Sequence, residues 1–134
     1  MTNKEQIYNV LERLGYKPQY DEDGDILMRY QLKLLLFLTQ DDDEEHFVNV
    51  TLPQFSSVPE GQELLYLAAC NKLTRETKMA KVFIDHTLKN VTATCEFFFD
   101  DEETLEKNIV RTLRILSIIR TAYNVCIKEM SDEE

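Results

Sequence analysis

The chain has 134 residues, and its 15 Lys and Arg residues against 25 Asp and Glu residues give a formal net charge of −10. This length is typical of one domain, and with 43% hydrophobic residues the chain can bury a core without a metal ion or a disulfide. We therefore expect a single domain over residues 1–134 with an acidic tail at 131–134. The acidic balance argues against nucleic-acid binding, because such binding depends on Lys and Arg side chains that neutralise phosphates.

The cysteines and the apolar runs indicate the compartment. Cys70, Cys95 and Cys126 lie far apart without a C-x-x-C spacing, as reduced core thiols do. The first residues lack the apolar run of a signal peptide, and the aliphatic run Leu34 to Leu38 is too short to span a bilayer. We therefore expect a cytoplasmic protein that neither enters a membrane nor needs a cofactor.

The first half of the chain begins with a predicted helix. Thr2 and Glu5 form a capping box, and apolar residues follow at helical spacing until Gly15 ends the pattern. This predicts an amphipathic helix over about residues 3–14. The turn dipeptide Asp23-Gly24 predicts a hairpin, and aliphatic or alternating runs predict further strands. A short hairpin is predicted at 17–21 and 25–30, and it counts as one unit in the order of elements. The next two main strands of this half are predicted at 32–39 and 46–52.

The second half of the chain begins with another predicted helix cap. Ser57 and Glu60 have the spacing of a capping box, which predicts a helix over about residues 58–73. Two alternating runs joined by a short polar segment predict a second hairpin, and the acidic segment after it favours the start of a long helix. The predicted elements are strands at 78–86 and 91–99 and a helix at 102–129.

These elements define the fold class. In their order, α-β-β-β-α-β-β-α, the strands are linked by short turns instead of helical crossovers, and such strands pair antiparallel. We therefore predict an α+β domain in which an antiparallel sheet of about five strands carries the helices on one face. The last helix is apolar on more than one side, which indicates either a central position in the core or a dimer interface.

The predicted sheet has more apolar side chains than one covered face requires. Alternation assigns one face of each strand to the core, and Leu32, Leu34, Leu36 and Leu38 are taken as the inward set of their strand. Large apolar residues then remain on the outer face, where such patches mark interaction surfaces. The predicted partner-binding residues are Leu35, Phe37, Phe47, Phe83 and Phe98. The alternative is that these residues are scattered, or that a loop covers them on a strongly twisted sheet.

The sequence carries no strong catalytic or metal-binding motif. The acidic segment Asp21 to Asp25 lacks the later Gly and Glu that an EF-hand calcium loop needs, so a charged turn explains it better. The acidic segment 41–45 fails the same test and is expected to be a solvated connection. His46 and His86 lack zinc-ligand spacing, and no metal is predicted. A small enzyme built around Cys70 or His86 stays as an alternative, although only 3 glycines argue against a built catalytic loop.

A set of local features extends over nearly the whole chain and ends with the long final helix. The segments are Leu14-Gly15-Tyr16, the acidic turn Asp21 to Asp25, Leu52-Pro53-Gln54-Phe55, Asn71 and Lys81-Val82-Phe83-Ile84-Asp85. Together they resemble the YbjN family of small bacterial proteins, whose fold is similar to that of the type III secretion chaperones. Gln31, at a position where a turn glycine would be comfortable, departs from this pattern.

The resemblance implies a sensory transduction regulator with no established chemistry and no active-site residues. The similar secretion chaperones are small, acidic, cytoplasmic and usually dimeric, and they hold an extended client segment along apolar surfaces. We therefore predict a non-catalytic protein-binding module, a regulator or chaperone-like adaptor, that contacts a protein partner or a second copy of itself. The alternatives are a type III secretion-type chaperone for a specific client and the small enzyme described above.

Overall fold

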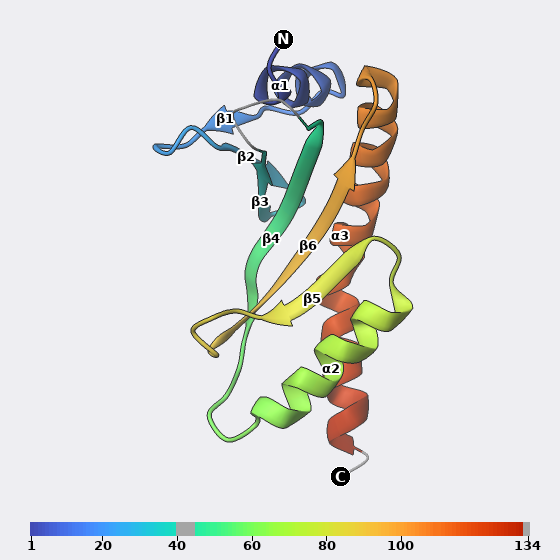
Figure 1. Cartoon of the computed structure of the whole chain (residues 1–134). Coiled ribbons are helices and arrows are strands. Elements are labelled where there is room, and N and C mark those ends of the chain that lie inside the picture. The colour runs from blue at the N-terminus through green and yellow to red at the C-terminus, as the bar shows by residue number, and fades with distance from the viewer. Residues whose placement is uncertain (40–44, 133–134) are drawn as a thin grey trace.

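The computed structural model describes residues 1–39 and 45–132 (Figure 1). Its elements, in chain order, are α1 (Asn3–Arg13), β1 (Gln19–Tyr20), β2 (Ile26–Tyr30), β3 (Lys33–Leu38), β4 (Phe47–Ser57), α2 (Glu63–Glu76), β5 (Ala80–Ile84), β6 (Asn90–Phe98) and α3 (Glu102–Asp132). The predicted acidic connection at 41–45, apart from Glu45, and the last two residues of the predicted acidic tail lie outside the described residues.

The strands form one antiparallel sheet in the order β1-β2-β3-β4-β6-β5. The α+β class and the antiparallel pairing are confirmed, but the described part of the sheet has six strands instead of about five. β1 has only two residues, lies within the predicted strand 17–21 and pairs with β2 at the edge of the sheet, as the predicted hairpin requires. The sixth strand therefore comes from counting both arms of this hairpin separately.

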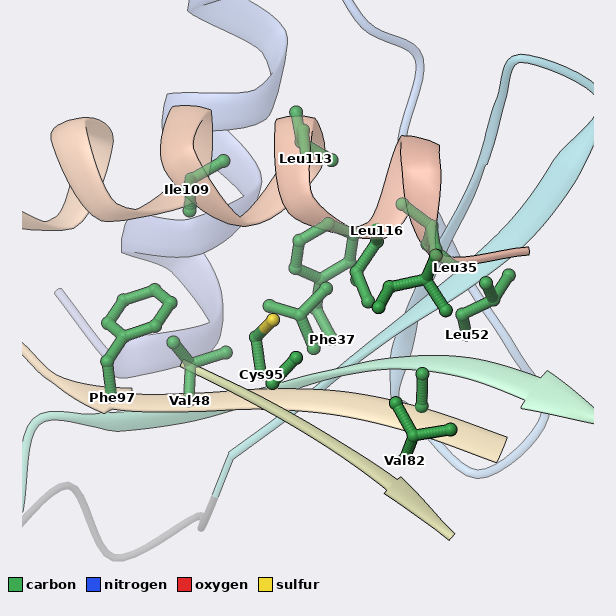
Figure 2. Close-up of a cluster of buried hydrophobic side chains, with 14 of the residues drawn as sticks. Leu35, Phe37, Val48, Leu52, Val82, Cys95, Phe97, Ile109, Leu113 and Leu116 are labelled. Atoms are coloured by element: carbon green, nitrogen blue, oxygen red, sulfur yellow. The ribbon is translucent and has the colours of Figure 1, made fainter. Parts of the chain in front are cut away.

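The helices leave one face of the sheet uncovered. α3 contacts β4, β6, α1 and α2, and α2 also packs against β5. Figure 2 shows Ile109, Leu113 and Leu116 of α3 above the inner side chains of the sheet, which include Phe37 and Cys95. α3 therefore lies centrally in the core, which is the first of the two positions that its wide apolar surface indicates.

α2 also closes the free edge of the sheet. The Thr74 hydroxyl donates a hydrogen bond to the Val82 carbonyl (3.1 Å) and accepts one from the Val82 N–H (2.9 Å). These two bonds satisfy backbone groups of the edge strand β5 that would otherwise be open to pairing with another chain. Strand addition at this position of β5 is therefore blocked by the fold itself.

The two predicted helix caps have different outcomes. The Thr2 capping box is confirmed, since the Thr2 hydroxyl accepts a hydrogen bond from the Glu5 N–H (3.1 Å) at the start of α1. The cap at Ser57 is wrong, because Ser57 belongs to β4 and pairs with β6, and α2 begins only at Glu63. Pairing with β6 satisfies the backbone over this segment, and a bulge after Leu52 lets β4 continue past the local turn signals.

The turn between β2 and β3 carries backbone strain. Gln31 (φ +50°) and Leu32 (φ +65°) both occupy the left-handed region, as a two-residue type I′ hairpin requires, and Leu32 is 99% exposed. A side chain with a Cβ costs about 1–2 kcal/mol in this conformation. We expect Leu32→Gly to raise the free energy of unfolding by about 1 kcal/mol in urea denaturation. The control Leu32→Ala also removes the exposed side chain but keeps the Cβ, so an equal gain from Ala would contradict backbone strain as the cause.

Candidate functional site: the helix-free face of the sheet

The side chains of β3 alternate in the opposite sense to the prediction. Leu35 and Phe37 are fully buried, whereas Leu34 is 44% exposed and Leu36 and Leu38 are only half-buried. Leu35 and Phe37 pair with the buried residues Met28 and Ile26 of β2. The predicted outward position of Leu35 and Phe37 is therefore wrong, and a partner-contact role that needs their exposure is not available to them.

The physical reason is that β3 is apolar on both of its faces. Leucine or phenylalanine occupies every position from 34 to 38, so the hydrophobic pattern does not distinguish the two faces. The register is set instead by the tight turn at Gln31 and Leu32, which aligns β3 with β2. A strand shifted by one residue exchanges its faces completely.

An apolar surface crosses the helix-free face. Leu36 pairs with Leu27 of β2, and the rings of Phe47 and Phe98 pair between β4 and β6 with centroids 5.1 Å apart. Leu38 pairs with Asn49, and Phe47, two residues before Asn49, is within the diagonal reach of about 7–8 Å between neighbouring strands. We call this the Leu/Phe surface, and it consists of Leu27, Leu34, Leu36, Leu38, Phe47 and Phe98.

Exposure is concentrated at the two ends of the Leu/Phe surface. Phe98 is 65% exposed and Leu34 is 44% exposed, while the other members are half-buried by their neighbours. Exposed aromatic and aliphatic side chains on one face are a composition typical of protein interfaces, in which aromatic residues are enriched. Of the predicted contact residues, the structure brings Phe47 and Phe98 together on this surface.

Phe83 lies apart from the other phenylalanines. It is 39% exposed and pairs with Thr92 of β6, which is six residues from Phe98, or about 20 Å along the strand. The strip between them is polar and contains a salt bridge of 2.8 Å between Lys81 and Glu96. The five predicted residues therefore do not form one patch, and the leucines of β2 and β3 supply the part that was not predicted.

The acidic segment Asp21 to Asp25 forms the turn that the sequence predicts. The Asp21 carboxylate accepts hydrogen bonds from the backbone N–H groups of Asp23 and Asp25, each at 2.9 Å. This is the hydrogen bonding of a local Asx turn, and it explains why one carboxylate oxygen each of Asp21, Asp23 and Asp25 lies within 4.8 Å of the others. The turn places a concentration of negative charge at the β1 edge of the sheet (Figure 1).

The residues of the enzyme alternative, Cys70 and His86, lie in different environments. Cys70 is buried between α2 and the core, and burial raises the pKa of its thiol to about 11. Burial likewise raises the pKa of the Cys95 thiol to about 12. His86 is exposed in the turn between β5 and β6. The Cys70 thiol therefore stays protonated at neutral pH, whereas a nucleophilic cysteine acts as the thiolate.

No helix within residues 1–39 and 45–132 combines the length and the hydrophobicity needed to cross a membrane.

The fold and the sequence both have counterparts among known proteins. The chain is similar to the solved structure of YbjN from E. coli, described as “a putative transcription regulator”, with 11% sequence identity, a TM-score of 0.71 and 90% of each chain covered. It is also similar to the structure of an uncharacterized protein from Methanothermobacter thermautotrophicus, with 11% identity, a TM-score of 0.49 and 98% of each chain covered. Curated protein sequences give no significant match.

The likeness to the E. coli YbjN structure shows the fold alone, because the sequence identity is 11%. The family is shown by a sequence model, “YbjN: Putative bacterial sensory transduction regulator”, which matches residues 3–127. The match includes all nine helices and strands of the described chain up to the last turns of α3. The chain therefore belongs to the YbjN family.

Proposed function

We propose that this protein is a non-catalytic regulatory module that binds a protein partner through the Leu/Phe surface. The observation that carries the proposal is the placement of a row of leucines and a phenylalanine pair on the face of the sheet that the helices do not cover. The family description as a regulator of sensory transduction supports a role in binding rather than in chemistry.

The energetic argument concerns the exposed part of this surface. Full burial of one Leu or Phe side chain contributes about 1.5–3 kcal/mol, so covering Phe98 and Leu34 gives a partner a substantial driving force. Phe98 is the most exposed member of the Leu/Phe surface, and aromatic side chains are enriched among the residues that carry most of the binding free energy of interfaces. Phe98 is therefore the residue whose loss should weaken binding most.

Charge adds selectivity to this surface. The net charge is −10, and the acidic turn Asp21 to Asp25 borders the same end of the sheet as Leu27. A partner segment with apolar side chains flanked by Lys or Arg is favoured there, whereas an acidic segment is repelled. Phe83 stays a separate predicted contact, because the polar strip around Lys81 and Glu96 divides it from the Leu/Phe surface.

Site-specific photocrosslinking in cells tests this proposal. A photoreactive phenylalanine analogue at Phe98 is compared with the same analogue at Ile118, which is 60% exposed on α3. We expect a discrete crosslinked protein from position 98 only, and we expect Leu34→Ser in the same chain to reduce its yield several-fold. Equal products from both positions, or no product from position 98, would contradict the proposal.

A chaperone for a specific client is a narrower form of the same proposal. In that case the Leu/Phe surface would hold an extended segment of the partner, in the manner of apolar client sites that bind unfolded chain. Limited proteolysis of the crosslinked product distinguishes the two. A chaperone protects a short segment of an otherwise protease-sensitive partner, whereas an adaptor protects a folded domain.

A further inference from the structure

A cleft lies where β3 and β4 separate. Among the described residues, β3 pairs with β4 only from Leu36 to Leu38, whereas Lys33 and Leu34 pair with β2 alone. A bulge between Leu52 and Ser56 interrupts the regular course of β4 beside this point. The cleft has a volume of about 220 Å³, and its lining includes Lys33, Leu34, Leu52, Pro53, Gln54 and Arg120.

Two cations line this cleft from different elements. Arg120 follows Leu116 by one turn of α3, and Leu116 is buried above the inner side chains of the sheet (Figure 2). Arg120 therefore lies on the side of α3 that faces the sheet. Lys33 lies on the same face of β3 as the buried Leu35, two residues later. Both cations thus come from the core-facing sides of their elements and reach the gap between two strands.

The charge of this cleft is opposite to that of the whole protein. The net charge of the chain is −10, but the described residues that line the cleft include no Asp or Glu. Lys33 is half-buried and Arg120 is exposed, and neither forms a salt bridge within residues 1–39 and 45–132. Two uncompensated cations that line one cleft attract an anion.

The backbone of the bulge indicates which kind of anion fits. Phosphate sites commonly use successive backbone N–H groups. Pro53 has no N–H, and Gln54 donates its own N–H to the Thr92 hydroxyl (3.1 Å). The side chains of Lys33 and Arg120 are therefore the main donors that the cleft offers. A guanidinium group matches the two oxygens of a carboxylate with two parallel hydrogen bonds, which favours a carboxylate.

We propose that this cleft binds a carboxylate attached to a short apolar group, with the carboxylate between Lys33 and Arg120 and the apolar group against Leu34 and Leu52. The volume of about 220 Å³ lies below the range of about 300–1,000 Å³ for drug-sized ligands, so the ligand is small. A short organic acid and the C-terminal residue of a peptide both have this chemistry. The proposal does not depend on the proposed function, although Leu34 also belongs to the Leu/Phe surface.

An NMR titration with hexanoate tests the proposal, with hexanamide as the uncharged control of the same shape. We expect hexanoate to shift the backbone amide signals of Lys33, Gln54 and Arg120, and we expect hexanamide to bind at least tenfold more weakly. Inorganic phosphate should also bind more weakly than hexanoate, because the bulge lacks free N–H groups at its start. Equal binding of hexanoate and hexanamide, or no shift at these residues, would overturn the proposal.

Two variants test the assigned cations. Arg120→Gln should weaken hexanoate binding at least tenfold and Lys33→Gln several-fold, because each removes one charge from the cleft. Arg114→Gln is the matched control, since Arg114 is exposed on α3, has no salt bridge among the described residues and does not line the cleft. An equal effect of Arg120→Gln and Arg114→Gln would contradict the assignment. Thermal unfolding of each variant checks that the fold is kept.

A peptide titration distinguishes the two sources of the carboxylate. A short peptide that ends in leucine is compared with the same peptide carrying a C-terminal amide. Tighter binding of the free-acid peptide than of hexanoate assigns the cleft to a chain end, and the reverse order assigns it to a small organic acid. Both results support the proposal, provided that Arg120→Gln weakens the tighter ligand. Equal binding of the acid and the amide peptide, together with equal binding of hexanoate and hexanamide, would show that the cleft does not recognise a carboxylate.

Discussion

Replacing Phe37 with Ala is expected to lower the free energy of unfolding by about 3–5 kcal/mol, which is the usual cost of removing a fully buried phenylalanine. Phe37 is 0% exposed and lies beneath α3, next to Cys95 and Leu116 in Figure 2. Its loss leaves a cavity that the surrounding sheet and helix fill only in part. Urea denaturation of the variant and the wild type measures the difference.

Phe98→Ala is the matched control for this prediction. Phe98 is 65% exposed on the opposite face, so its replacement should change the free energy of unfolding by less than about 1 kcal/mol. Leu35→Ala should resemble Phe37→Ala, whereas Leu34→Ala should resemble Phe98→Ala. If Leu34→Ala lowered the free energy of unfolding strongly and Leu35→Ala did not, β3 would have the orientation predicted from the sequence.

The stability of the protein is expected to fall steeply as the pH rises from about 9 towards 12. Burial raises the pKa of the Cys70 thiol from 9.0 to about 11 and that of the Cys95 thiol from 9.0 to about 12. Above pH 9 the unfolded chain releases these protons while the folded protein keeps them. The stabilisation is therefore complete below pH 9 and is lost as the pH approaches the folded pKa values, by roughly 1.4 kcal/mol per pH unit for each thiol. Burial of the Tyr123 hydroxyl raises its pKa as well and acts in the same direction.

Urea denaturation at several pH values between 8 and 11 measures this slope. Cys95→Ala removes one of the titrating thiols, and we expect its stability to decline less steeply than that of the wild type, whatever its stability at pH 8. The comparison of slopes separates the thiol from the surface groups that also titrate in this range. Parallel curves for the two proteins would show that Cys95 is not protected from ionisation by burial.

The structural elements that are determined by residues close together in the sequence could be predicted well. The α1 capping box, the Asp23-Gly24 turn and the hairpin of β5 and β6 use hydrogen bonds and dihedral preferences that a few consecutive residues determine. The class of the sheet follows from the same local signals, since short turns between strands impose antiparallel pairing. The boundary of α2 could not be predicted in this way, because the pairing of Ser57 with Asn90 outweighs a local cap.

The candidate site shows the same division. Sequence alone determined that the sheet contains a surplus of apolar side chains, and it identified Phe47 and Phe98, whose strands have one clearly apolar face. Which side of β3 faces outward, and so which leucines join these phenylalanines, was decided only in the tertiary structure. The physical reason is that a strand apolar on both faces gains similar burial from either register, and the choice belongs to the turn and to the partner strand that hold it.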